Sequence, residues 1–133
     1  MPFVNLALVP ELGTSFWLPA QIGYLAAAEL VLLALPFDAR RVAELGLVTR
    51  VVADADLIAT ALDTARRLIR QPAGAVGASK RLMRRVLGSQ MAAASELEMR
   101  EYASRLQSDE AKEALNAFFE KRQPDFTKFK ATA

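Results

Sequence analysis

The 133-residue chain is 53% hydrophobic and 24% charged, a composition that is typical of a folded globular domain and excludes a disordered chain. Its 17 Lys and Arg residues nearly balance its 15 Asp and Glu residues, and a net charge of +2 does not favour a nucleic-acid partner. The chain has no Cys and no His, which excludes disulfide bonds, Cys/His zinc sites and mechanisms that need a thiol or an imidazole. Acid–base chemistry would therefore come from carboxylates, Lys or Tyr.

The sequence predicts no membrane segment. Its longest apolar run, residues 25–37, contains Glu29 and Pro36 and is shorter than the roughly 20 residues that a membrane-spanning helix needs. The first ten residues carry no Lys or Arg and no small-residue cleavage site, so they do not predict a secretory signal. We therefore expect a cytoplasmic location.

The first part of the chain predicts one short strand and one buried helix. Residues 3–9 form a short apolar run between two prolines, which fits either a strand or extended segment or a core turn. Residues 11–19 predict a loop that leads into a helix, with Thr14 or Ser15 as its N-cap. The predicted helix over 20–33 is apolar on nearly every side, which is typical of a helix covered on more than one face.

The rest of the chain predicts mostly helix. A short helix over 39–45 ends at Gly46, and the β-branched run 47–52 predicts a second short strand. Apolar spacing then predicts helices over 55–70, 73–88, 91–106 and 109–122, the last with Ser108 as its N-cap. We therefore predict a mainly α fold of five or six helices and one or two short strands, resembling the later part of a domain because the strands lack partners.

Several motifs occur in the order and at the spacing of one known superfamily. They are Pro2-Phe3-Val4-Asn5-Leu6-Ala7-Leu8-Val9-Pro10-Glu11-Leu12-Gly13-Thr14-Ser15, Gly46-Leu47-Val48, Ser108-Asp109-Glu110 and Ala117-Phe118-Phe119-Glu120-Lys121-Arg122. Over essentially its full length the chain resembles the crotonase superfamily of enoyl-CoA hydratases and isomerases. The resemblance implies a CoA thioester as substrate, and neither a cofactor nor a metal.

The resemblance covers only the second half of the superfamily's domain. It implies the C-terminal part of a crotonase-like α/β fold that lacks the N-terminal ββα spiral. Residues 1–54 would end the crotonase core, and residues 55–133 would form a C-terminal helical region for oligomerisation and CoA contacts. In the superfamily both N–H groups of the oxyanion hole come from the first half, so the resemblance implies a very poor catalyst as a lone chain.

Glu11 is the candidate catalytic residue. Taken by itself, it is either a solvated loop carboxylate near a helix N-terminus or a base. The resemblance implies a base, because residues 10–15 match the pattern of Δ3,Δ2-enoyl-CoA isomerases, in which one Glu removes a proton from C2 and returns it to C4. The second Glu of the related hydratases aligns with Phe3, which has no proton to transfer, and this favours an isomerase.

Phe118 and Lys121 are the candidate CoA-binding residues. The resemblance implies that they hold the adenine and phosphates, because a ring suits an adenine face and a cation suits a phosphate. A basic last turn that balances the helix dipole is the alternative for Lys121 and Arg122. The basic cluster over 79–85 has no interleaved aromatic residue and is interpreted as a solvated face rather than a nucleic-acid or membrane contact.

The leading hypothesis is an enoyl-CoA hydratase/isomerase family protein of the Δ3,Δ2-isomerase type, incomplete as a lone chain. The alternative is a non-catalytic helical oligomerisation subunit, or a truncated relic, of a crotonase-fold protein. Crotonase-like proteins commonly form trimers through this region, so the expected partners are an acyl-CoA and either further copies of the chain or a longer crotonase-fold protein.

Overall fold

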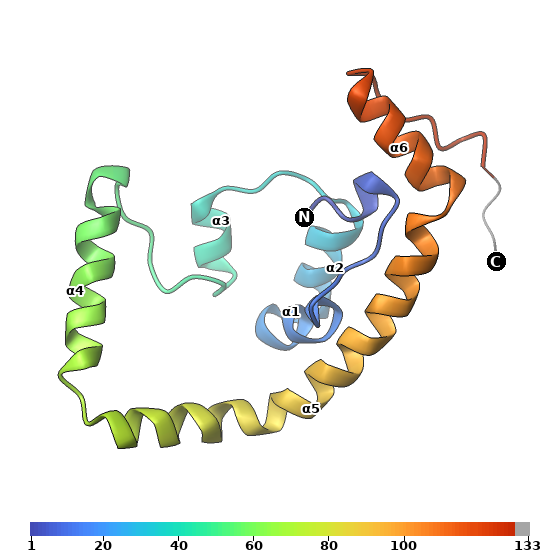
Figure 1. Ribbon diagram of the computed structural model, residues 1–133. Helices are drawn as coiled ribbons and strands as arrows, with labels where there is room; N and C mark the ends of the chain where they lie inside the picture. Colours follow the sequence, from blue (N-terminus) through green and yellow to red (C-terminus); the bar gives the residue numbers. More distant parts are fainter. Residues whose placement is uncertain (130–133) are drawn as a thin grey trace. The chain divides into compact units, whose positions relative to one another are not determined.

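The computed structural model describes residues 1–129, and the regular elements of that part are all helical (Figure 1). They are the 3-10 helices η1 (Val4–Leu6) and η2 (Asp54–Asp56) and the α-helices α1 (Thr14–Ile22), α2 (Tyr24–Leu32), α3 (Ala39–Glu44), α4 (Leu57–Ile69), α5 (Ala73–Leu106) and α6 (Asp109–Phe119). The chain divides into two compact units, one made of residues 1–36 with the chain from Met91 onward, the other of residues 37–90. The predicted mainly α class is confirmed.

Neither predicted strand is present in the described residues. Residues 3–9 instead contain η1, where the carbonyl oxygen of Phe3 accepts hydrogen bonds from the N–H groups of Leu6 at 3.1 Å and Leu8 at 2.9 Å. Residues 47–52 follow α3 as irregular chain. A strand must pair its backbone groups with a neighbouring strand, and residues 1–129 contain none to pair with.

Two helices replace the single buried helix predicted over 20–33. Gly23, with φ of 80°, ends α1 and separates it from α2. Leu18 of α1 and Leu30 of α2 are buried, whereas Leu25 of α2 is 83% exposed. The cover on more than one face that the sequence predicts is therefore incomplete in this chain, since Tyr24 and Leu32 are also more than half exposed.

Helix α5 runs unbroken where two helices, 73–88 and 91–106, were expected. Gly88 and Ser89 lie inside it. A glycine in a helix interior costs only about 1 kcal/mol relative to Ala, and no proline removes a backbone hydrogen bond at this point. The helical turns on both sides therefore continue through the glycine.

Two predicted helix ends match the structure. The Ser108 hydroxyl accepts a hydrogen bond from the N–H of Ala111 at 3.1 Å and so caps α6. Gly46 follows α3 with φ of 77°, and its N–H bonds back to the carbonyl oxygen of Ala43 at 3.0 Å. Helix α6 ends at Phe119, three residues before the predicted end.

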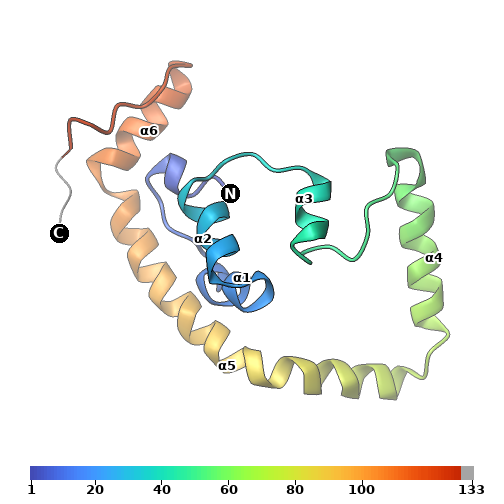
Figure 2. The ribbon, with the colours of Figure 1, turned by 180° about the vertical axis from the view of Figure 1, so that it is seen from behind.

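In the first unit, η1 lies beside α6, as both Figure 1 and the reverse view in Figure 2 show. Arg105, near the end of α5, donates from Nε to the carbonyl oxygen of Ala7 at 3.1 Å and forms an ion pair with Glu110. Three small residues of α6 are also buried: Ala111, Ala114 and Ala117. Among the described residues, no helix combines the length and the apolar character that crossing a membrane requires.

Candidate functional site

Glu11 lies in the turn that leads into α1 and is half-buried. Its carbonyl oxygen accepts a hydrogen bond from the N–H of Thr14 at 3.1 Å, so the backbone reverses directly after it. The next two residues, Leu12 and Gly13, are both left-handed, with φ of 59° and 77°. A residue with a side chain rarely adopts this conformation, and such strain concentrates at functional sites. The candidate base therefore sits on a closely constrained turn.

The backbone of this turn packs directly against α5 at Gly13. A Cβ atom at this position would lie 2.6 Å from Cγ of Met91 and 3.3 Å from both the carbonyl oxygen of Met91 and the hydroxyl oxygen of Ser95. Real Cβ atoms essentially never come as close as the first of these distances. Position 13 therefore requires glycine for its space as well as for its φ angle.

A buried carboxylate on α5 completes the turn. Glu98, which is only 6% exposed, accepts the N–H of Gly13 at 2.6 Å and the N–H of Ser15 at 2.7 Å. These bonds satisfy N–H groups at the start of α1, a helix without a side-chain cap of its own. The patterns in the sequence do not single Glu98 out. The signal that could have done so is its i, i+4, i+7 spacing with Met91 and Ser95, which places all three on one helix face.

An apolar cavity of about 150 Å³ borders the same turn. It is lined by Pro10, Thr14, Ser15, Pro19, Tyr24, Ala27, Ala28, Val31 and Leu32. Pro10, directly before Glu11, and Thr14, at the end of the same turn, belong to this lining, whereas Glu11 itself does not. Such a lining suits the hydrocarbon part of a ligand.

The two candidate CoA contacts lie at the C-terminal end of α6. Phe118 is 71% exposed, and its ring meets that of Phe119 edge to face with centroids 5.8 Å apart. Lys121 is left-handed, with φ of 55°, and its N–H bonds back to the carbonyl oxygen of Phe118 at 3.2 Å. Glycine is the usual residue at this point after a helix, so Lys121 carries backbone strain. The exposed ring and the cation are thus held one turn apart.

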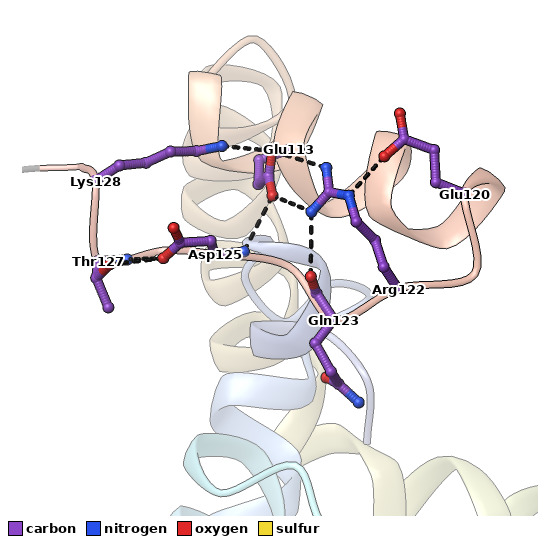
Figure 3. Close-up of polar contacts among 7 residues, drawn as sticks. All are labelled: Glu113, Glu120, Arg122, Gln123, Asp125, Thr127 and Lys128. Carbon is purple, nitrogen blue, oxygen red and sulfur yellow. Dashed lines mark hydrogen bonds and ion pairs between the residues drawn. The ribbon is translucent and has the colours of Figure 1, made fainter.

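A group of four residues, here called the Glu113 cluster, ties the tail to α6; it comprises Glu113, Arg122, Asp125 and Lys128 (Figure 3). Glu113 is 7% exposed and accepts hydrogen bonds from Nη1 of Arg122 at 2.6 Å, from the backbone N–H of Asp125 at 3.0 Å and from Nζ of Lys128 at 2.7 Å. All three donors come from the segment that follows Lys121. The cluster therefore holds the backbone next to a candidate CoA contact.

The Glu113 cluster also fixes the charges of its members. The hydrogen bond from Arg122, followed by those from the Asp125 N–H and from Lys128, holds the pKa of Glu113 well below its ordinary value despite burial. The hydrogen bonds to Glu113 and then to Glu120 raise the pKa of the Arg122 guanidinium in turn.

These bonds predict that acid weakens the cluster. Since the folded-state pKa of Glu113 is lowered, its contribution to stability is complete above its ordinary pKa of 4.5 and is lost as the pH falls below that value. Melting temperatures of the native chain and of Glu113→Gln should differ most at about pH 7, and the difference should narrow steadily as the pH falls below 4.5. Glu101→Gln, which removes an exposed carboxylate of α5, is the control. A gap that does not change with pH would contradict the prediction.

Glu11 and the pair at the end of α6 remain separate. Within residues 1–129, no hydrogen bond, ion pair or ring contact joins Glu11 to Phe118 or Lys121. Phe3, at the start of η1, is half-buried and supplies only its backbone to the contacts described above. The described part of the chain also holds no group of three acidic side chains that could bind a metal.

The family of the chain follows from comparison with known proteins. The family model described as enoyl-CoA hydratase/isomerase matches residues 1–129. The chain belongs to the enoyl-CoA hydratase/isomerase family. The chain is similar to a crystal structure of an enoyl-CoA hydratase/isomerase from Pseudoalteromonas atlantica, with a TM-score of 0.90 and 40% identity over 94% of this chain and 50% of that one. The crotonase fold expected from the motifs is thereby confirmed for the matched half.

Related sequences carry both hydratase and isomerase names. A probable enoyl-CoA hydratase of Rhodobacter capsulatus is 34% identical over 94% of this chain and 49% of its own length. The 1,2-epoxyphenylacetyl-CoA isomerase of Escherichia coli is 34% identical over 96% of this chain and 48% of its own length. This family member therefore spans about half the length of the curated relatives it matches.

Proposed function

We propose that this chain serves a Δ3,Δ2-enoyl-CoA isomerase-type proton shift on an acyl-CoA thioester, with Glu11 as the base. The observation that supports it most is the place of Glu11, on a constrained turn whose residues Pro10, Thr14 and Ser15 line an apolar cavity. A carboxylate beside an apolar space is a suitable group for removing a proton next to a thioester. An isomerase of another CoA thioester stands among the relatives, alongside more numerous hydratases.

The proposed reaction uses one carboxylate twice. Glu11 removes a proton from C2, and the electron pair of that C–H bond spreads into a dienolate that reaches the thioester oxygen. Glu11, now protonated, returns the proton to C4, so the double bond moves from C3 to C2 and no atom is gained or lost. Hydration would need a second proton-transferring group. The resemblance aligns the second Glu of the hydratases with Phe3, which cannot transfer a proton.

Stabilisation of the enolate oxygen is the step that these residues do not supply. In the crotonase superfamily that the sequence resembles, both oxyanion-hole N–H groups belong to the first half of the domain. One lost donor of this kind costs about 10²–10³ in rate. The proposed activity therefore needs that half, on the same polypeptide or on a partner.

The proposal extends to CoA binding at Phe118 and Lys121. We expect Lys121→Ala to weaken binding of CoA to the whole chain about threefold to tenfold, the effect of losing one exposed ion pair of about 1 kcal/mol. Titration calorimetry measures the change. The matched control is Lys112→Ala, because Lys112 lies on α6 as well but pairs with Asp109 at 2.8 Å. Equal affinity in the native chain and Lys121→Ala would argue against this contact.

The experiment that tests the function is turnover of a 3-enoyl-CoA to its conjugated 2-enoyl isomer, followed by ultraviolet absorbance. The chain is assayed alone and together with the first half of a family member, supplied as a separate fragment. Isomerisation by the mixture supports the proposal. A 3-hydroxyacyl-CoA as the main product from a 2-enoyl-CoA would make the protein a hydratase instead.

The non-catalytic alternative is favoured by one observation, the exposed apolar side chains of the first unit. Those of α1, α2 and the segments beside them include Leu12, Tyr24, Leu25, Leu32, Leu33 and Leu35, each more than half exposed. Apolar patches of this kind mark interaction surfaces. A mixture that associates with the added half but turns over neither substrate would support this alternative.

A further inference from the structure

Glu98 is the buried carboxylate that none of the functions above uses. It lies on α5, yet both of its carboxylate oxygens accept hydrogen bonds from the turn that carries Glu11. The two donors, Gly13 and Ser15, lie 85 and 83 residues earlier in the chain. Oε2 accepts the N–H of Gly13 at 2.6 Å and Oε1 accepts the N–H of Ser15 at 2.7 Å. One carboxylate therefore spans the N–H groups on both sides of Thr14.

Burying the charge of Glu98 costs free energy, and the contacts of this carboxylate must offset that cost. Among residues 1–129, no Lys or Arg forms an ion pair with Glu98. Its compensation comes from two short charge-assisted hydrogen bonds and from the positive end of the α1 dipole. A buried ion without a counter-charge usually stabilises a fold less than an apolar residue of the same size. A role in holding the geometry of the turn accounts for its presence.

The two hydrogen bonds act on the segment that carries the candidate base. Gly13 is two residues after Glu11, and the carbonyl oxygen of Glu11 accepts the N–H of Thr14 at 3.1 Å. The turn is therefore closed on itself at Glu11 and fastened to α5 at Gly13 and Ser15. The left-handed conformation of Leu12 persists between these two attachments.

We infer that Glu98 is a positioning residue, which fixes the direction of Glu11 by holding the Gly13 and Ser15 amides. The inference rests on the proposed role of Glu11 as the base. Glutamine at position 98 keeps the shape but offers one acceptor oxygen, and its NH₂ group faces an N–H donor. One of the two bonds must then be lost, and the turn is released at one attachment.

Nuclear magnetic resonance on the whole chain tests the inference without any need for activity. In Glu98→Gln we expect the amide resonances of Gly13 and Ser15 to move, their hydrogen exchange to become faster, and the carbon resonances of Glu11 to move with them. Glu101→Gln, an exposed charge change on the same helix, should leave all three residues unchanged. Movement confined to Gly13 and Ser15, with the carbons of Glu11 unchanged, would overturn the inference.

If Glu98→Gln does not fold, a second variant tests the same inference. Glu98→Asp keeps the charge but is one methylene too short to reach both amides, and it should give the same signature at Glu11. In the native chain, couplings across the hydrogen bonds should join the Glu98 carboxyl carbon to both amide nitrogens. Their absence would show that the bridge does not exist in solution.

Enzyme kinetics distinguish a failure of this inference from a failure of the proposed function. In the active mixture, Glu98→Gln should lower kcat by about tenfold to 10²-fold and leave KM unchanged, because a misplaced base slows chemistry without weakening substrate binding. A rise in KM alone would overturn the positioning role. If Glu11→Gln retains full turnover, the proposed function fails, whereas the resonance shifts still report whether Glu98 holds the turn.

Discussion

Replacing Glu11 with glutamine should lower turnover of a 3-enoyl-CoA by about 10²–10⁴-fold, the usual contribution of a general base. Glutamine has the same shape as glutamate but cannot accept the proton from C2 at neutral pH. The backbone bond from the Thr14 N–H to the carbonyl oxygen at position 11 does not involve the side chain, so the turn should persist. The measurement is the rise in ultraviolet absorbance of the conjugated product under saturating substrate.

The control for this variant is Glu101→Gln, which removes the same charge from an exposed position on α5. It should keep the turnover of the native chain. Circular dichroism and melting temperature of Glu11→Gln should match those of the native chain, so that lost turnover is not lost folding. Undiminished isomerisation in a folded Glu11→Gln variant would remove Glu11 from the mechanism.

Gly13→Ala should destabilise the chain by about 2–4 kcal/mol, the second large effect that we expect. One part of this cost is the left-handed φ of 77°, which disfavours any side chain by roughly 1–2 kcal/mol. The other part is steric, because the new Cβ would lie 2.6 Å from Cγ of Met91 and 3.3 Å from the Met91 carbonyl oxygen. The free energy of unfolding in urea measures the sum.

Gly46 supplies a matched control for that experiment. It has the same φ of 77°, but a Cβ atom there would meet nothing within 4 Å. Gly46→Ala should therefore cost only the backbone part, roughly 1–2 kcal/mol. If Gly13→Ala costs no more than Gly46→Ala, α5 does not press against the Glu11 turn in solution.

Local signals in the sequence were sufficient wherever a helix end depended on its own residues. Ser108 and Gly46 act at their helix ends as predicted, because a hydroxyl cap and a left-handed glycine need only neighbours a few residues away. The same local rules failed at Gly88, where a weak helix former lies within a long helix that continues on both sides. They failed again at 47–52, because a strand depends on a partner that propensity cannot supply.

Some residues of the candidate site could likewise be identified from local sequence, and others could not. The motif around Glu11 and the ring and cation near the end of α6 could be named from sequence order, because each is a continuous stretch of residues. Glu98 could not be named in this way. Its contact depends on which face of α5 meets the start of α1, and Glu98 is 83 residues away from Ser15 in the sequence. The Glu113 cluster was missed for a related reason, because the turn after Lys121 must reverse the chain before Asp125 and Lys128 can reach α6.

The sequence by itself therefore determined the helical class and the family, and it named Glu11 as the candidate base. Composition, apolar spacing and contiguous motifs carry that information along the chain, where neighbouring residues interact whatever the fold. Only the tertiary structure decided that the Glu11 turn is fastened to α5 by a buried carboxylate and that the tail is fastened to α6 by Glu113. Hydrogen bonds between distant segments depend on backbone geometry in three dimensions, and no local pattern of side chains specifies it.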